Sequence, residues 1–183
     1  MTAKRMKRAL IVGTTVAVLA ISSVMALGEG NGWWKTPVAE PVQQSLLPIE
    51  VEEAVLEALV GAEGEYAAYA TYDAILEEYG NVNPYANIMA AEAKHIDALK
   101  EILDLYHVAY PDENPYLGMI EAPTSLAEAA QTGVDAEIAN VLLYEEQLEA
   151  VADYPDIVTV FLNLQAASQE QHLPAFERAV ARY

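Results

Sequence analysis

Apolar residues recur every three or four positions along four long stretches of the chain, which is the spacing of one face of an α-helix. The stretches cover about residues 48–79, 84–106, 125–152 and 153–179. No stretch alternates apolar and polar residues in the way that a half-buried strand does. The pattern therefore predicts an all-α protein with four helices.

Residues that typically begin or end α-helices lie close to the ends of these four stretches. Proline can occupy the first turn of a helix, glycine commonly ends one, and Ser with Glu three residues later forms a capping box. The chain places these signals at Pro48, Gly80-Asn81, Asn83-Pro84, and Ser125 with Glu128. Pro174 falls inside the fourth helix, where it removes the hydrogen bond to the carbonyl of Glu170 and should bend the chain.

The connections between the predicted helices are short, long and short. The long one, residues 108–123, holds three prolines and a glycine and separates the second helix from the third. Four helices with one long crossover in the middle form the ferritin-like variant of the four-helix bundle. We therefore predict a ferritin-like four-helix bundle over residues 48–183.

The N-terminal part of the chain carries an export signal. Residues 1–27 are predicted to form a hydrophobic leader helix, because a basic cluster precedes an uncharged apolar run over residues 9–27. This run can be a cleaved signal peptide or an uncleaved membrane anchor, and both place the remainder outside the cytoplasm, secreted or on the outer face of the cytoplasmic membrane. Residues 28–47, rich in Gly, Pro and Gln, are predicted to be a linker.

The amino-acid composition limits the kinds of partner that the protein can bind. The chain has 28 Asp and Glu against 9 Lys and Arg, a net charge of −19, and no cysteine. So acidic a chain is not expected to bind nucleic acid, and it would meet a membrane only through residues 9–27 if these are not cleaved. Without cysteine, a metal would have to be held by Glu, Asp, His or Tyr. The sequence also leaves open whether the protein forms a homodimer.

Each predicted helix places ionisable side chains on its apolar face. Glu92 and His95, three residues apart, share one face, and burying such groups without a partner is costly. Di-metal carboxylate bundles use a Glu from each of two helices and Glu-x-x-His from each of the other two. The chain supplies, in the expected order, Glu65, Glu92, His95, Glu137 and His172. Carboxylates and imidazoles suit iron or manganese, so we predict two metal ions, with iron as the first choice.

The fourth carboxylate of such a centre is missing. Gln169, not Glu, stands three residues before His172. Two divalent ions with three carboxylates would leave a charge of about +1. This charge favours a bridging hydroxide, lower affinity at one metal, or a single-metal site. The centre could also be completed by the carbonyl of Gln169, or by the adjacent Glu170 if the distortion at Pro174 turns it inward.

Several positions have competing interpretations. Glu63 rivals Glu65 as the first ligand, because the stripe of Glu63 is also apolar. Tyr69, Tyr72 and Tyr144 share the ligand stripes, where we expect core aromatics whose hydroxyls bond to the ligands, with a redox tyrosine as the alternative. Each inward polar residue could also be satisfied separately by hydrogen bonds, but five of them in the expected order favour a metal.

The chain resembles a known family over about residues 50–180. The matching segments are Glu65-Tyr-Ala-Ala-Tyr-Ala-Thr-Tyr72, Glu78-Tyr79-Gly80, Asn87-Ile88 with Glu92-Ala-Lys-His95, Gly133 with Glu137, and His172-Leu-Pro-Ala-Phe176. They are similar to the rubrerythrin and ferritin-like superfamily, above all to the uncharacterised prokaryotic group called domain of unknown function 2202. The resemblance favours Glu65 over Glu63 and implies that a non-Glu residue is tolerated at position 169. Related rubrerythrins carry a carboxylate where Asn140 stands here, which argues against rubrerythrin-like peroxidase chemistry.

Two functions of different classes follow from these observations. The first is a di-iron oxidoreductase acting on oxygen or peroxide as a small oxidant. In it, Glu65 and His95 would hold one ion, Glu137 and His172 the other, and Glu92 would bridge. The second is a non-catalytic ferritin-like module for cell-surface interaction or metal sequestration, which the missing carboxylate favours.

Overall fold

The computed structural model describes residues 44–183, and within this range the chain contains helices and their connections but no strand. The all-α prediction is confirmed for these residues. None of their helices is both long and apolar enough to cross a bilayer. The predicted leader, residues 1–27, and the predicted linker up to residue 43 lie outside the described residues.

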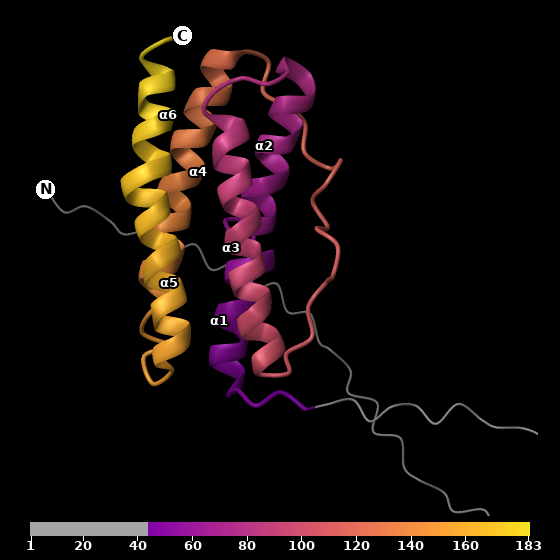
Figure 1. Cartoon of the computed structure of the whole chain (residues 1–183), viewed down its shortest axis with the longest axis vertical. Coiled ribbons are helices and arrows are strands. Elements are labelled where there is room, and N and C mark those ends of the chain that lie inside the picture. Colours follow the sequence, from indigo (N-terminus) through magenta and orange to yellow (C-terminus); the bar gives the residue numbers. More distant parts are fainter. Residues whose placement is uncertain (1–43) are drawn as a thin grey trace, which may run out of the picture. The chain divides into compact units, whose positions relative to one another are not determined.

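The helices form four rods (Figure 1). The first consists of α1 (Ile49–Val60) and α2 (Glu65–Tyr79), the second of α3 (Tyr85–Leu105), the third of α4 (Leu126–Gln147), and the fourth of α5 (Pro155–Ala167), the π-helical turn η1 (Ser168–His172) and α6 (Leu173–Val180). The four predicted helices are therefore present, although the first and fourth are each interrupted.

The rods lie side by side in an arrangement compatible with a helical bundle. Helix α2 packs along α3, and α4 packs along α5 and α6. The long connection after α3 returns along the outside of the bundle, so that α3 and α4 run in the same direction (Figure 1). The prediction of a long middle connection is thus confirmed.

The break between α1 and α2 fixes where Glu65 lies. A Cβ on Gly64 would stand 2.6 Å from the carbonyl oxygen of Ala58, so the close turn requires glycine. The carbonyl of Val60, which loses its helical partner at the break, accepts a hydrogen bond of 2.8 Å from the Tyr116 hydroxyl of the long connection. Glu65 consequently becomes the first residue of α2.

Helices α4 and α6 approach each other closely at Gly133. A Cβ there would lie 2.4 Å from Cδ1 of Phe176, whose ring is fully buried. The Phe176 ring packs against the rings of Tyr72 and Tyr85, with centroids 5.2 Å and 5.3 Å away. Glycine at position 133 therefore lets this aromatic cluster fill the end of the bundle core.

Several boundary predictions were wrong in detail. Helix α4 ends at Gln147 instead of about residue 152, and turns follow it. Asn83 does not cap α3: the N-cap residue is Pro84, with no side-chain hydrogen bond. The Ser125 hydroxyl accepts from the Glu128 N–H as predicted, but the Glu128 carboxylate returns to the N–H of Thr124 and not to that of Ser125. The last four residues of the predicted linker, 44–47, are among the described residues and are not helical.

Candidate metal centre

The five sequence-predicted ligands meet in the interior of the bundle. Glu65 comes from the start of α2, Glu92 and His95 from α3, Glu137 from α4, and His172 from the last position of η1. The three glutamates are at most 2% exposed, and the two histidines are 8% and 4% exposed. Four separate rods therefore bring ionisable groups to one enclosed place.

The five side chains form two overlapping trios. In the first, Nδ1 of His95 lies 2.7 Å from Oε2 of Glu92 and 3.3 Å from Oε2 of Glu65. In the second, Nδ1 of His172 lies 3.1 Å from Oε1 of Glu92 and 3.4 Å from Oε2 of Glu137. The two imidazole rings stack at 5.5 Å. Glu92 thus presents one oxygen to each trio.

The geometry of both trios fits a shared cation. Two donors that each lie about 2.1 Å from one ion, at about a right angle, are roughly 3 Å apart, which matches the observed separations. Oε2 of Glu92 and Nδ1 of His172 are buried yet have no aligned hydrogen-bond partner among the described residues. Buried polar atoms are rarely left in this state, so the two atoms are candidates for ligation. The donors within each trio are close enough together to hold an ion.

Two tyrosines orient the outer carboxylates. The Tyr72 hydroxyl donates to Oε1 of Glu137 at 2.7 Å, and the Tyr144 hydroxyl donates to Oε1 of Glu65 at 2.5 Å. Each bond leaves the other carboxylate oxygen facing a histidine. This confirms the expectation for Tyr72 and Tyr144. Tyr69 is half-buried and packs against the apolar core, and no hydrogen bond between described residues joins it to the centre.

The predictions for the fourth helix near position 169 were wrong. Gln169 and Glu170 are both exposed, so neither completes the second trio. The reason is η1, in which the Leu173 N–H bonds to the carbonyl of Ser168, five residues back. This wider turn places Ser168, and not residue 169, on the inward side next to His172. The irregularity caused by Pro174 is therefore a π-helical turn that begins before it.

Ser168 and Asn140 lie next to the centre, and of these two residues the sequence analysis had singled out Asn140 alone. The Ser168 hydroxyl, 1% exposed, donates to Oδ1 of Asn140 at 2.8 Å. The Asn140 amide in turn donates to the backbone carbonyl of Glu63 at 3.2 Å and to Oε1 of Glu65 at 3.4 Å. Glu63 itself is exposed, so Glu65 is the residue that faces the interior.

In the metal-free protein the histidines hold protons strongly. Burial lowers the pKa of His95, but the carboxylates of Glu65 and Glu92 outweigh it and raise this pKa from 6.5 to about 10. For His172, burial is likewise outweighed by Glu137 and Glu92, which raise its pKa to about 9. Two imidazolium ions therefore balance part of the carboxylate charge at neutral pH.

The carboxylates differ in their affinity for protons. Burial, reinforced by the charge of Glu92, raises the pKa of Glu65 from 4.5 to about 7. Burial also raises the pKa of Glu92, but the contacts with His172 and His95 outweigh it and lower that pKa below 4.5. Glu92 is therefore the carboxylate that stays ionised between the two histidines.

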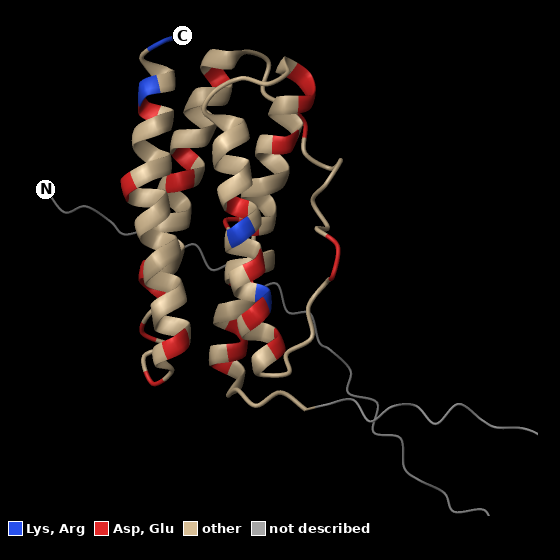
Figure 2. Cartoon of the chain, in the orientation of Figure 1, with Lys and Arg blue, Asp and Glu red and all other residues tan. Residues whose placement is uncertain are grey.

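This donor set could hold a divalent cation. Three carboxylates supply hard, negatively charged oxygens, and two imidazoles supply nitrogen donors. Acidic residues also cover all four rods, with few basic ones among them, which favours the approach of cations (Figure 2). No family model, no curated protein and no solved structure matches this chain.

Proposed function

We propose that this protein is an exported, ferritin-like di-metal protein that holds two iron ions, or manganese ions in their place, and reacts with oxygen or peroxide. One observation carries the proposal. Glu92 offers an oxygen to each of two buried Glu/His trios, and its Oε2 and the Nδ1 of His172 are buried without an aligned hydrogen bond. A cation in each trio would satisfy these atoms.

Each residue has a role in this proposal. Glu65 and His95 hold one ion, Glu137 and His172 hold the other, and Glu92 contributes to both. The hydroxyls of the tyrosines that donate to the outer carboxylates keep those carboxylates turned inward. When bound, iron or manganese would supply the change of valence that redox chemistry on oxygen or peroxide requires.

The two tyrosine hydroxyls remain proton donors in this role. Burial, followed by the charge of the neighbouring Glu137, raises the pKa of Tyr72 well above 10. Burial and the charge of Glu65 do the same for the pKa of Tyr144. Both phenols therefore stay protonated across the physiological range and donate to their carboxylates.

A second candidate function, metal sequestration without catalysis, is favoured by the missing fourth carboxylate. With Gln169 and Glu170 exposed, three carboxylates of residues 44–183 are buried in the interior, and no fourth is found in that range. Two divalent ions would leave the centre with a charge of about +1, which lowers its affinity for the second ion. A protein that binds metal but consumes no oxidant would fit this alternative.

The ferritin-like assignment and the location are parts of the same proposal. The long middle connection, the parallel course of α3 and α4, and the family resemblance of the sequence support a ferritin-like bundle (Figure 1). The apolar run over residues 9–27 supports export. Fractionation of cells producing the full-length chain would check the location, with a chain lacking residues 1–27 as the control.

The redox part can be tested by loading the full-length protein with Fe²⁺ without oxygen and then adding oxygen or peroxide. We expect stoichiometric iron, an absorption change on oxidation, and consumption of the oxidant. His172→Ala should remove these signals, whereas Glu170→Ala, an exposed neighbour in the same turn, should keep them. Iron binding without oxidant consumption would favour sequestration, and no iron binding would contradict both functions.

A further inference from the structure

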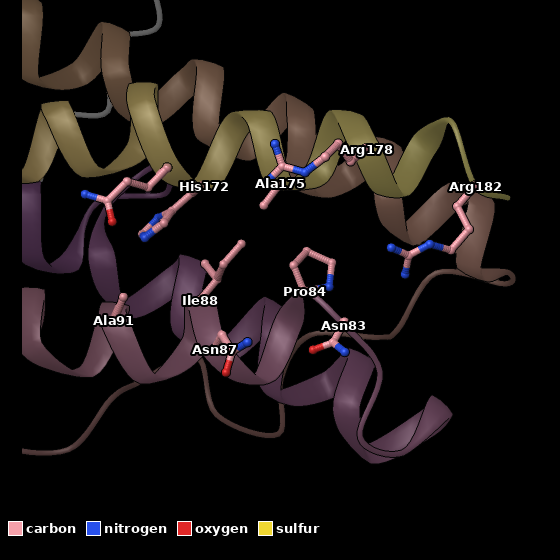
Figure 3. Close-up of a pocket in the computed structure, with 10 residues that line it drawn as sticks. Asn83, Pro84, Asn87, Ile88, Ala91, His172, Ala175, Arg178 and Arg182 are labelled. Atoms are coloured by element: carbon pink, nitrogen blue, oxygen red, sulfur yellow. The ribbon is translucent and has the colours of Figure 1, made fainter.

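A groove of about 500 Å³ lies between the first half of α3 and the last turns of the fourth rod. His172, one of the five centre residues, lines it, together with apolar side chains such as Ile88 and Ala175 and amide groups such as Asn87. Figure 3 shows His172 at one end of the groove and Arg182 at the other. Pockets for small molecules typically have volumes of about 300–1,000 Å³, so this groove is large enough for one.

Two arginines give the groove its charge. Of the nine basic residues in the chain, four lie in residues 44–183, and two of these, Arg178 and Arg182, line this groove. Arg178 lies in α6, and Arg182 lies four residues later in the turn that follows this helix, so two positive charges line one groove. Neither forms an ion pair with a carboxylate of the described residues, although acidic residues are abundant. An oxyanion bound in the groove near both side chains would offset this local positive charge.

We propose that the groove binds a small organic anion, a carboxylate or a phosphate ester, with its anionic group on Arg178 and Arg182 and its other end against His172. Guanidinium groups recognise such oxyanions with paired hydrogen bonds. The apolar side chains between the two ends suit a short carbon skeleton. Among residues 44–183 acidic side chains far outnumber the other basic ones and repel anions, so binding depends on these two arginines.

The consequence for chemistry rests on the proposed di-metal function. A molecule anchored at the arginines would present its far end to the histidine side of the centre, which makes it a candidate substrate. The positive charge of about +1 left at an occupied centre would also favour an anionic molecule nearby. Binding in the groove itself does not require the metal, because the arginines and the apolar lining belong to the protein.

Binding can be measured by calorimetric titration of the full-length, metal-free protein with two probes, hexanoate and inorganic phosphate. We expect both to bind saturably, and Arg178→Gln with Arg182→Gln to weaken both at least tenfold. Lys94→Gln, an exposed lysine of α3 outside the groove, is the control for loss of charge and should change affinity less than twofold. Ala175→Leu should weaken hexanoate severalfold but leave phosphate unchanged, because it fills only the apolar part.

The outcomes separate this inference from the proposed function. Absence of saturable binding, or equal weakening by Lys94→Gln and the arginine variants, would overturn it. If Ala175→Leu affects neither probe, the site is a bare oxyanion site and the organic part of the inference is wrong. Arg178→Lys with Arg182→Lys, which keeps the charge, should restore part of the affinity. These results are independent of whether the protein binds iron.

Discussion

The π-helical turn in the fourth rod makes opposite predictions for two neighbouring residues. Ser168 is 1% exposed and bonds to Asn140, whereas Gln169 is exposed. We therefore expect Ser168→Asp to put a fourth carboxylate among the buried ones, and Gln169→Glu to add one only to the surface. In a regular α-helix, residues 168 and 169 stand four and three positions before His172 and both neighbour its face, so Gln169→Glu would then also add a carboxylate near the centre.

The expected losses of folding stability in the two variants differ enough to be measured. A buried charge without a partner destabilises a protein by about 3–5 kcal/mol, and Ser168→Asp adds such a charge in the metal-free state, next to the acceptor oxygen of Asn140. An exposed substitution usually changes stability by less than about 0.5 kcal/mol, which is the expectation for Gln169→Glu. With a urea dependence of about 2 kcal/mol per molar, the first variant should unfold at roughly 2 M less urea than the wild type.

Urea unfolding of the metal-free, full-length protein, followed by far-ultraviolet circular dichroism, measures these shifts. Ser168→Ala is the control that removes the hydrogen bond to Asn140 without adding charge, and it should cost about 1 kcal/mol. Metal affinity should be unchanged in Gln169→Glu. The reasoning is refuted if Gln169→Glu loses several kcal/mol and binds metal more tightly while Ser168→Asp is tolerated.

Two further predictions follow from the centre and its packing. In the metal-free protein, the raised pKa values of His95 and His172 contribute stability that is complete below pH 6.5 and is lost as the pH rises through about 9 to 10. The raised pKa of Glu65 adds a loss between pH 4.5 and about 7, so the urea midpoint should fall steadily from pH 5 to pH 10, and a flat profile would contradict the assignment. Gly133→Ala should destabilise by about 1–3 kcal/mol, because its Cβ would overlap the buried ring of Phe176, and a thermal midpoint equal to that of the wild type would show that the ring moves away freely.

The helices and the buried candidate ligands were predictable because both follow from the spacing of apolar residues along a helix. A single charge among apolar residues at helical spacing is conspicuous, and Glu65, Glu92 and Glu137 each stood out in this way. The order of these glutamates and of the two histidines along the chain then indicated a di-metal site. The structure confirms that these residues are buried and adjacent, without identifying a metal.

The details near His172 were not predictable from spacing, because the turn there is not α-helical. In a regular α-helix residues 168 and 169 would both neighbour the face of His172, whereas in the π-helical turn Ser168 is buried and Gln169 is exposed. Pro174 was the only local signal, and it does not specify how the backbone accommodates it. Likewise, the choice between Glu63 and Glu65 depended on a glycine break whose geometry the sequence does not give.

The arginine groove could not be found from the sequence either. Its lining comes from the start of α3 and from the end of the fourth rod, which are about 90 residues apart in the chain. Each of its residues alone resembles an ordinary surface or core position. Only the packing of the two helices brings Arg178 and Arg182 into one groove with His172.

The most direct test of the central claim is the number of metal ions per chain. The full-length protein, loaded with Fe²⁺ or Mn²⁺ and freed of excess, should carry two ions when analysed by inductively coupled plasma mass spectrometry. Glu92→Ala should lose both, because Glu92 faces both histidines, whereas Glu101→Ala, an exposed glutamate of the same helix, should keep them. Metal-free wild-type protein, or equal metal content in Glu92→Ala and Glu101→Ala, would contradict the account.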